Sequence, residues 1–256
     1  MAKHVLIVSG LDPSGGAGFI ADVRVVSEHG LRPVGVVSAL TEQDTSGVRA
    51  VEAANAERVD GQLHALLSDV EIAAVKIGML GDEHLCKVVS DALQLTAAPV
   101  VWDPIVRPTR GGVALYAGNV VDAAATLADH LTLVTPNIAE AELLCGQTID
   151  SVKTMHSASL ALHQRLDCAV LITGGHLAGE NVIDVLASNG ATQELSGDRI
   201  TGGTDVHGTG CALSSAIACG LATGVDLVDA IDQAKRFVVG KLAAPATPGR
   251  GSAAVV

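Results

Sequence analysis

A glycine-rich turn that leads into an apolar helix is the segment of this chain best suited to chemistry. The turn reads His207-Gly208-Thr209-Gly210-Cys211. Because the first N–H groups of a helix lack internal partners and the helix dipole adds positive potential there, the turn can seat a phosphate or a developing oxyanion. Cys211 stands at the same helix start, where the pKa of a thiol tends to fall. Phosphoryl transfer is therefore suggested, and the candidate catalytic residues are Cys211, Gly208, Thr209 and Gly210.

The turn taken alone leaves other interpretations open. A glycine-rich turn before a helix is about as often only a turn, and a cysteine at a helix start is more often a packing residue. The segment is not a Walker pattern, because no Gly-Lys-Ser/Thr follows, and it is not G-x-G-x-x-G after a strand.

The composition restricts the kinds of partner. Of the 256 residues, 48% are hydrophobic and only 2% aromatic, so the core must consist of Ala, Val, Leu and Ile. A net charge of −12 argues against nucleic-acid binding, which needs a basic patch, and leaves an anionic substrate to helix N-termini and a few basic side chains. No apolar run approaches the roughly 18 residues of a membrane span, and we expect no cleaved leader.

The cysteines indicate a reducing compartment. They are scattered at Cys86, Cys145, Cys168, Cys211 and Cys219. Since no C-x-x-C pair occurs, no zinc site is indicated, and reduced thiols in the cytoplasm are expected.

Short apolar runs alternate with amphipathic stretches along most of the chain. The runs predicted as strands are Val5–Val8, Val34–Val37, Ala73–Ile77, Val100–Trp102, Leu131–Val134 and Ala169–Ile172. The stretches predicted as helices are Gly18–His29, Ala56–Leu67, Glu83–Leu93, Val120–Ala128, Ile138–Leu144 and Ser157–Arg165. Continuous apolar runs suit parallel strands covered on both faces, and strand–helix alternation implies right-handed crossovers. The predicted fold class is α/β, with a central, mostly parallel sheet and helices on both faces.

The pattern changes after Gly174-Gly175. The elements predicted there are a hairpin of Asn181–Ser188 and Gln193–Ser196 around Asn189-Gly190, and helices over Thr209–Ala222 and Leu227–Lys241. The tail Ala243–Val256 is rich in Pro, Gly and Ala, and its end is expected to fray. No linker or repeat marks a boundary, so residues 1–256 are predicted to form a single domain.

The residues that could do chemistry follow six predicted strands. They are Gly10 to Gly18, Gln43-Asp44, Gly78-Met79, Asp103-Pro104, Thr135-Pro136-Asn137 with Glu140, and Thr173-Gly174-Gly175. Ligands of doubly wound sheets bind outside the carboxyl ends of the strands, which is where these segments fall. The convergence of six loops on one edge is stronger evidence for a site than any single loop.

Together these segments resemble the hydroxymethylpyrimidine/phosphomethylpyrimidine kinases of thiamine biosynthesis, in the ribokinase-like superfamily. The segments that carry the resemblance are Gly10 to Gly18 with Ala21-Asp22, Ala39 to Thr45, Lys76 to Leu80, Asp103-Pro104, Thr135-Pro136-Asn137 with Glu140-Ala141, Gly174-Gly175-His176 and His207 to Cys211. The resemblance runs in order from about Val5 to Lys241. It implies ATP and Mg²⁺ as the donor system, an aminopyrimidine alcohol and its monophosphate as acceptors, and a homodimer.

The resemblance also assigns roles. Gln43 resembles the residue that reads the pyrimidine ring, and a side-chain amide offers the donor and the acceptor that this needs. Cys211 aligns with the catalytic residue that accepts or orients the proton of the substrate hydroxyl. The other assigned positions are Asp12, Ala17, Met79 and Val106 for the substrate, Asn137, Glu140, Thr173, Gly175, His207 and Arg110 for the nucleotide, and Asp103 and Glu140 for Mg²⁺, mostly through water.

Several of these residues have plainer interpretations. Gln43 alone fits a solvated loop residue, Asp12 fits an Asx turn, and Met79 fits an ordinary core position. Glu140 also fits a first-turn acid that the helix dipole favours.

The chain departs from the family pattern in two loops. Family members commonly carry Lys where this chain has Thr173, and their Ala-Lys-Ser-Gly after the Asp-Pro loop is replaced here by Pro108-Thr109-Arg110-Gly111. Arg107 or Arg110 is the candidate to supply the missing positive charge. Two other functions stay open: a pyridoxal or pyridoxine kinase, and a non-catalytic sensor of pyrimidines or nucleotides.

Overall fold

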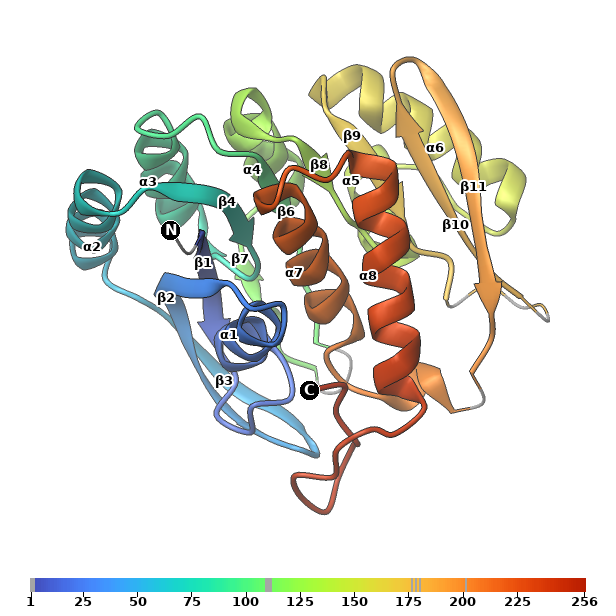
Figure 1. Ribbon diagram of the computed structural model, residues 1–256, viewed down its shortest axis with the longest axis horizontal. Coiled ribbons are helices and arrows are strands. Elements are labelled where there is room, and N and C mark those ends of the chain that lie inside the picture. Colours follow the sequence, from blue (N-terminus) through green and yellow to red (C-terminus); the bar gives the residue numbers. More distant parts are fainter. Residues whose placement is uncertain (1–2, 109–111, 176, 178, 180, 201) are drawn as a thin grey trace.

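The centre of the molecule is a nine-stranded sheet in the order β11-β10-β9-β8-β6-β4-β1-β2-β3, with helices on both faces (Figure 1). The computed structural model describes residues 3–108, 112–175, 177, 179, 181–200 and 202–256. The strands are β1 (His4–Leu11), β2 (Arg32–Asp44), β3 (Gly47–Ala53), β4 (Ile72–Ile77), β6 (Val100–Trp102), β8 (Leu133–Val134), β9 (Ala169–Ile172), β10 (Asn181–Ser188) and β11 (Ala191–Asp198), and β5 (Gly81–Asp82) pairs separately with β7 (Tyr116–Ala117). The helices are α1 (Gly18–Glu28), α2 (Ala56–Asp69), α3 (Glu83–Leu93), α4 (Val120–Leu127), α5 (Ile138–Cys145), α6 (Val152–Leu166), α7 (Thr209–Ala222) and α8 (Leu227–Leu242).

The six predicted strands form the parallel part of the sheet. β2, β1, β4, β6, β8 and β9 pair in parallel, while β3, β10 and β11 extend the two edges in antiparallel fashion. The hairpin of β10 and β11 turns at Asn189-Gly190, as the sequence predicted. The α/β fold class with a mostly parallel sheet is therefore confirmed.

Alternate side chains of the central strands enter two apolar cores. Val5 and Ile7 of β1 pack with α1, α7 and α8, whereas Leu6 and Val8 pack on the opposite face with α2 to α6. Both faces can be covered because both sets of alternating side chains are apolar. Trp102, the single tryptophan of the chain, is buried in the second of these cores and directly precedes Asp103.

Some elements differ from their predicted bounds. α6 begins at Val152 rather than Ser157, because Ser151 caps it: Ser151 Oγ accepts from the Thr154 N–H while Thr154 Oγ1 accepts from the Ser151 N–H. β2 continues to Asp44 rather than Val37, since its second half pairs with β3, a strand that the apolar pattern did not reveal.

The C-terminal segment is ordered against the turn before α7, which corrects the expectation that it frays. The His207 N–H donates to the Ala253 carbonyl at 2.8 Å, and the Val255 N–H donates to the His207 carbonyl at 3.1 Å. Ala254 and Val255 are buried. These backbone bonds hold His207 from both sides.

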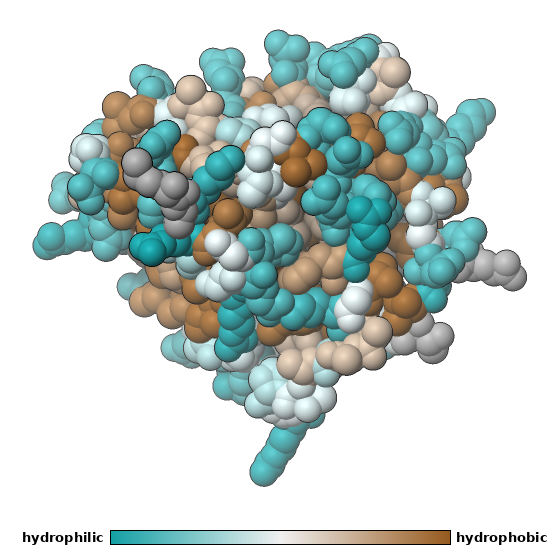
Figure 2. Space-filling model, viewed as in Figure 1, coloured by the Kyte–Doolittle hydropathy of each residue, from teal (hydrophilic) through white to brown (hydrophobic). Residues whose placement is uncertain are grey.

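The face covered by α1, α7 and α8 shows hydrophilic residues interspersed with hydrophobic ones (Figure 2). Throughout the described chain, the helices are too short or too polar to span a bilayer.

Candidate active site

Two adjoining cavities lie at the carboxyl ends of the parallel strands. The first, called the β1 cavity, measures about 200 Å³, and its lining includes Ser9, Gly10, Asp12, Ala17, Gln43, Met79, Asp103, Asn137, Glu140, His207, Gly208 and Cys211. The second, called the α8 cleft, measures about 180 Å³, and its lining includes Gly175, Asp184, Arg199, Lys235, Val239 and Leu242. Thr173, Thr209 and Gly210 line both cavities and form their shared wall.

The start of α7 supplies the polar part of this shared wall. Gly208 precedes the helix with a φ of +86°, the first turn holds no acidic residue, and no side chain among the described residues caps the helix. The first N–H groups of α7, including those of Thr209 and Gly210, are therefore free to bind an anion where the two cavities meet.

Burial is the main influence on the pKa of the Cys211 thiol. It raises the pKa of that thiol to about 12, although the positive charge of Lys76 opposes the shift, and the carboxylates of Asp103 and Asp22 raise the pKa further. The expectation of a lowered thiol pKa is therefore wrong, because desolvation of the buried thiol outweighs the charge of Lys76 and the hydrogen bond from the Gly18 backbone, which act in the other direction. At neutral pH the thiol is protonated, so it can orient a hydroxyl group by hydrogen bonding but holds no thiolate ready to accept a proton.

A buried ion pair lies close to this turn. Lys76 Nζ donates to Asp22 Oδ2 at 2.8 Å, and neither side chain is exposed. Ser215 Oγ of α7 donates to Asp22 Oδ1 at 2.8 Å, which connects the pair to the helix. A buried pair loses much of its Coulombic gain to desolvation, so stability alone is a weak reason for it. Sequence reasoning missed it, although a lysine inside the apolar run Ala73–Ile77 was the available signal.

Asp103 and Glu140 place two buried carboxyl groups in the β1 cavity. Burial raises the pKa of Asp103 to about 6, against the opposing effect of Lys76. Burial and the charge of Asp103 raise the pKa of Glu140 well above its usual value. A cation bound at the cavity would stabilise two desolvated carboxylates that repel each other, which fits Mg²⁺ held by one or two carboxylates with water and phosphate.

The number of protein ligands available to a metal ion at this site is small. Within the part of the chain that the structure describes, no three His, Cys, Asp or Glu side chains are grouped to hold a metal ion. Glu140 also has a structural role, since its Oε2 accepts from the Asn137 N–H at 2.9 Å and Asn137 Oδ1 accepts from the Glu140 N–H at 3.0 Å. This capping box starts α5 and fixes both side chains at the cavity.

Asp12 and Gln43 both contact the same ring nitrogen of His207 in the β1 cavity, and it is Asp12 that accepts the hydrogen bond from that nitrogen. Asp12 Oδ2 lies 3.0 Å from His207 Nε2, and the same ring nitrogen lies 3.2 Å from Gln43 Nε2. Asp12 Oδ1 accepts from the Ser14 N–H at 2.8 Å, which is the Asx turn given as the plainer interpretation. Burial opposes ionisation of Asp12, yet hydrogen bonds from His207 and Ser14 lower its pKa.

Met79 provides an apolar wall of the same cavity. It is nearly fully buried and packs in a small cluster with Ala39, Val48 and Leu115. A Cβ at Gly10 would lie 2.4 Å from Met79 Cε, so the thioether occupies the space that the glycine leaves. Met79 is thus a core residue that also lines the cavity, and its contact with a substrate ring stays a prediction.

Among the described residues, two cationic side chains line the α8 cleft, and each donates hydrogen bonds to other groups of the protein. Lys235 Nζ donates to Asp184 Oδ2 at 2.6 Å, and Asp184 Oδ1 accepts from the Gly174 N–H at 2.8 Å. The guanidinium of Arg199 donates to the carbonyls of Gly175, Leu177 and Gly179 at 2.5–2.8 Å. These contacts fix the loop that follows β9.

Comparison with known proteins identifies the family of this chain. The sequence model of a family described as "Phosphomethylpyrimidine kinase" matches residues 12–256, almost the whole chain. This chain belongs to the phosphomethylpyrimidine kinase family.

Individual relatives agree with this family. The hydroxymethylpyrimidine/phosphomethylpyrimidine kinase of Rhizobium meliloti (strain 1021) is 37% identical over 240 residues, covering 93% of this chain and 90% of the relative. A crystal structure of phosphomethylpyrimidine kinase from Clostridium difficile 630 is similar with a TM-score of 0.79 and 31% identity, covering 93% of this chain and 98% of that one. The pyridoxal kinase from Staphylococcus aureus in complex with ADP is similar with a TM-score of 0.90 and 26% identity, covering 100% and 93%.

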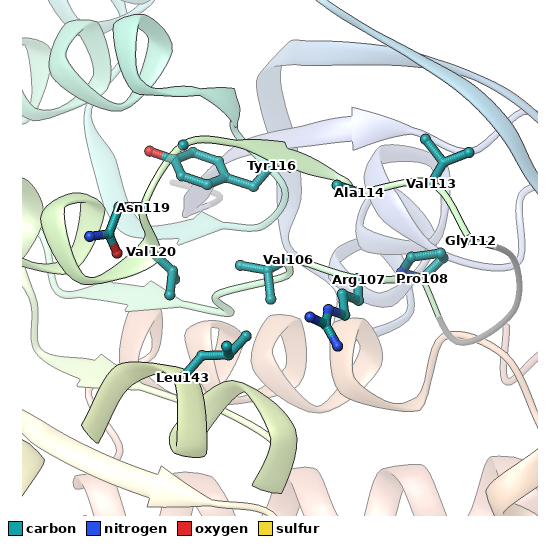
Figure 3. Close-up of a pocket in the computed structure, with 11 residues that line it drawn as sticks. Val106, Arg107, Pro108, Gly112, Val113, Ala114, Tyr116, Asn119, Val120 and Leu143 are labelled. Carbon is teal, nitrogen blue, oxygen red and sulfur yellow. The ribbon is translucent and has the colours of Figure 1, made fainter. Parts of the chain in front are cut away.

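Most of the predicted site residues that the structure describes lie together in the β1 cavity, and two, Gly175 and Val106, line neighbouring cavities. Gly175 lines the α8 cleft and not the β1 cavity. His207, which the resemblance assigns to the nucleotide, lines the β1 cavity. Val106 lines a neighbouring, larger cavity of about 750 Å³ together with Arg107, Tyr116 and Leu143 (Figure 3). The assignment of Arg110 falls outside the described residues.

Proposed function

We propose that this kinase transfers the γ-phosphoryl group of ATP to the hydroxyl of 4-amino-5-hydroxymethyl-2-methylpyrimidine, and then phosphorylates the monophosphate. The observation that carries the proposal is the shared wall of Thr173, Thr209 and Gly210 between two cavities of ligand size. An aminopyrimidine in the β1 cavity and a nucleotide in the α8 cleft would meet at the uncapped start of α7.

Catalysis of this kind depends mainly on positioning and on charge stabilisation. The N–H groups that begin α7 would stabilise the charge on the moving phosphoryl group, and they do so without reorganisation because Gly208 and the helix fix them. The protonated thiol of Cys211 would orient the attacking hydroxyl. Asp103 and Glu140 would hold Mg²⁺ through water, and the ion would neutralise and align the phosphate oxygens.

The first test is turnover. We expect purified, reduced protein with ATP and Mg²⁺ to phosphorylate the hydroxymethylpyrimidine at millimolar concentration, measured by coupled ADP release and by mass of the product. Pyridoxal is the necessary comparison, because the pyridoxal kinase of Staphylococcus aureus shares the fold with a TM-score of 0.90. Preference for pyridoxal would replace the proposed acceptor, and turnover of neither compound would support the sensor interpretation.

The second test concerns recognition of the ring. We expect Gln43→Ala to weaken binding of the pyrimidine by about 1–3 kcal/mol, because a ligand group buried in the cavity would lose its hydrogen-bonding partner. Binding of ATP in the α8 cleft should not change. Calorimetry with each ligand measures both effects, and Gln193→Ala, on the exposed strand β11, is the matched control. Equal losses for the two ligands would show that Gln43 does not read the ring.

A further inference from the structure

Gln43 lies in the β1 cavity between two polar side chains, each of which contacts one end of its amide. His207 Nε2 lies 3.2 Å from Gln43 Nε2, and Thr41 Oγ1 lies 3.2 Å from Gln43 Oε1. All three residues line the cavity and none of them is fully buried, so a ligand in the cavity can reach the amide. The two neighbours therefore act on the amide at the surface that would receive the ligand.

The hydrogens of these two neighbours are placed by other contacts. Asp12 Oδ2 accepts from His207 Nε2 at 3.0 Å. Burial opposes ionisation of Asp12, yet its hydrogen bonds lower its pKa, and a carboxylate at this distance requires a hydrogen on the ring nitrogen. Thr41 Oγ1 donates its single hydrogen to the Leu11 carbonyl at 2.9 Å. Toward Gln43, His207 thus presents an N–H group and Thr41 presents lone pairs.

Only one of the two orientations of the amide suits these neighbours. With Nε2 of Gln43 toward His207, two N–H donors face each other, and Oε1 faces a hydroxyl oxygen whose hydrogen is already used. A half-turn of the amide exchanges its oxygen and its nitrogen. With Oε1 toward His207, the oxygen shares the ring hydrogen with Asp12, and Nε2 donates to Thr41. Each end of the amide then meets a complementary group, and one N–H and one lone pair of Oε1 remain for a ligand.

We propose that His207 and Thr41 lock the Gln43 amide with Oε1 toward His207, and that this lock selects an amino group over an oxo group on the pyrimidine ring. The inference rests on the proposed function, since it takes the acceptor to be an aminopyrimidine whose ring is read by Gln43. Both neighbours are positioning residues, because they act through the amide.

The selection follows from the order of donors and acceptors along the ring edge. A 4-aminopyrimidine offers an amino donor beside a ring-nitrogen acceptor, whereas a pyrimidin-4-one offers a carbonyl acceptor beside a ring N–H donor. The free N–H and the free lone pair of a locked amide pair with only one of these orders. An amide that can make the half-turn pairs with both, so the neighbours rather than Gln43 itself supply the discrimination.

The test compares two ligands by calorimetry: 4-amino-5-hydroxymethyl-2-methylpyrimidine and its analogue with an oxo group at position 4. We expect the wild type to bind the amino compound about 100-fold more tightly, because the oxo compound brings like groups face to face at both ends of the amide. His207→Phe keeps a ring without the N–H group, and it should reduce this ratio of Kd values below about tenfold. A residue that only supports the fold would weaken binding of both ligands by the same factor and leave the ratio unchanged.

Thr41 supplies a matched pair of variants. Thr41→Val removes the hydroxyl with little change of shape and should also reduce the ratio, whereas Thr41→Ser keeps the hydroxyl and should retain the ratio. His156→Phe removes a histidine of α6 that contacts Thr192 Oγ1 at 2.8 Å, and it should change neither Kd. An unchanged ratio in either His207→Phe or Thr41→Val, or equal affinity of the wild type for the two ligands, would overturn the lock alone. Failure of the wild type to bind the amino compound would reject the proposed function itself.

Discussion

Gly208→Ala is expected to lower kcat at least about 10²-fold and to weaken ATP binding. A Cβ at this position would lie 2.0 Å from the Gly16 carbonyl oxygen, and the backbone there has a φ of +86°. The turn must therefore move away from the first glycine loop and take the N–H groups that begin α7 with it. Loss of one such donor to a developing negative charge costs about 10²–10³ in rate. Steady-state kinetics and nucleotide calorimetry measure the change.

Gly224 offers a matched control. It follows α7 with the same φ of +86°, but no atom of the described residues lies within 4 Å of the place of its Cβ. Gly224→Ala should carry the same backbone strain, of order 1 kcal/mol in stability, without a collision and without loss of kcat. If both variants lost kcat to the same extent, general destabilisation rather than displacement of the turn would be the cause.

Cys211→Ala is expected to lower kcat about 10- to 100-fold, with binding of both ligands preserved. The thiol is protonated at neutral pH because burial raises its pKa to about 12, so it acts by orienting the substrate hydroxyl. The interpretation of Cys211 as the proton acceptor instead predicts a loss of about 10²–10⁴. Cys219→Ala, at a buried position farther along the same helix, controls for packing in α7.

Cys211→Ser separates the two roles more sharply. A serine hydroxyl can orient the substrate by hydrogen bonding but does not ionise near neutral pH. We expect this variant to recover most of the activity lost in Cys211→Ala. Equal inactivity of the Ser and Ala variants would favour a thiolate, and kcat above about a third of the wild-type value in Cys211→Ala would leave catalysis to the backbone and the metal.

Elements with local signals were predictable from the sequence, whereas long-range pairing was not. α3 and α7 have their predicted bounds: Asp82 caps the first, and Gly208 precedes the second. By contrast, Thr41 to Asp44 extend β2 only because β3 lies beside them, and the polar residues give no periodic pattern. The order of the C-terminal segment likewise depends on His207, which lies far away in the sequence.

The residue types of the site were predictable, but their environments were not. Gln43, Asp12 and Cys211 lie in one cavity, as the convergence of loops suggested. The direction in which the pKa of Cys211 is shifted depends on desolvation and on the charge of Lys76. The sequence does not show that Lys76 lies close to Cys211. The contacts of the Gln43 amide are similarly hidden, because His207 lies 164 residues away in the sequence.

The position of Trp102 gives this enzyme a built-in optical reporter. The chain contains one tryptophan, and its side chain is buried directly before Asp103, beside Ile105 and Tyr116. Emission excited at the red edge of the absorption band therefore originates from a single indole next to the β1 cavity. Changes in its intensity or wavelength on addition of pyrimidine or nucleotide can be read in real time by stopped flow, with no label attached. The order in which the two substrates bind thus becomes accessible to measurement in the wild-type protein.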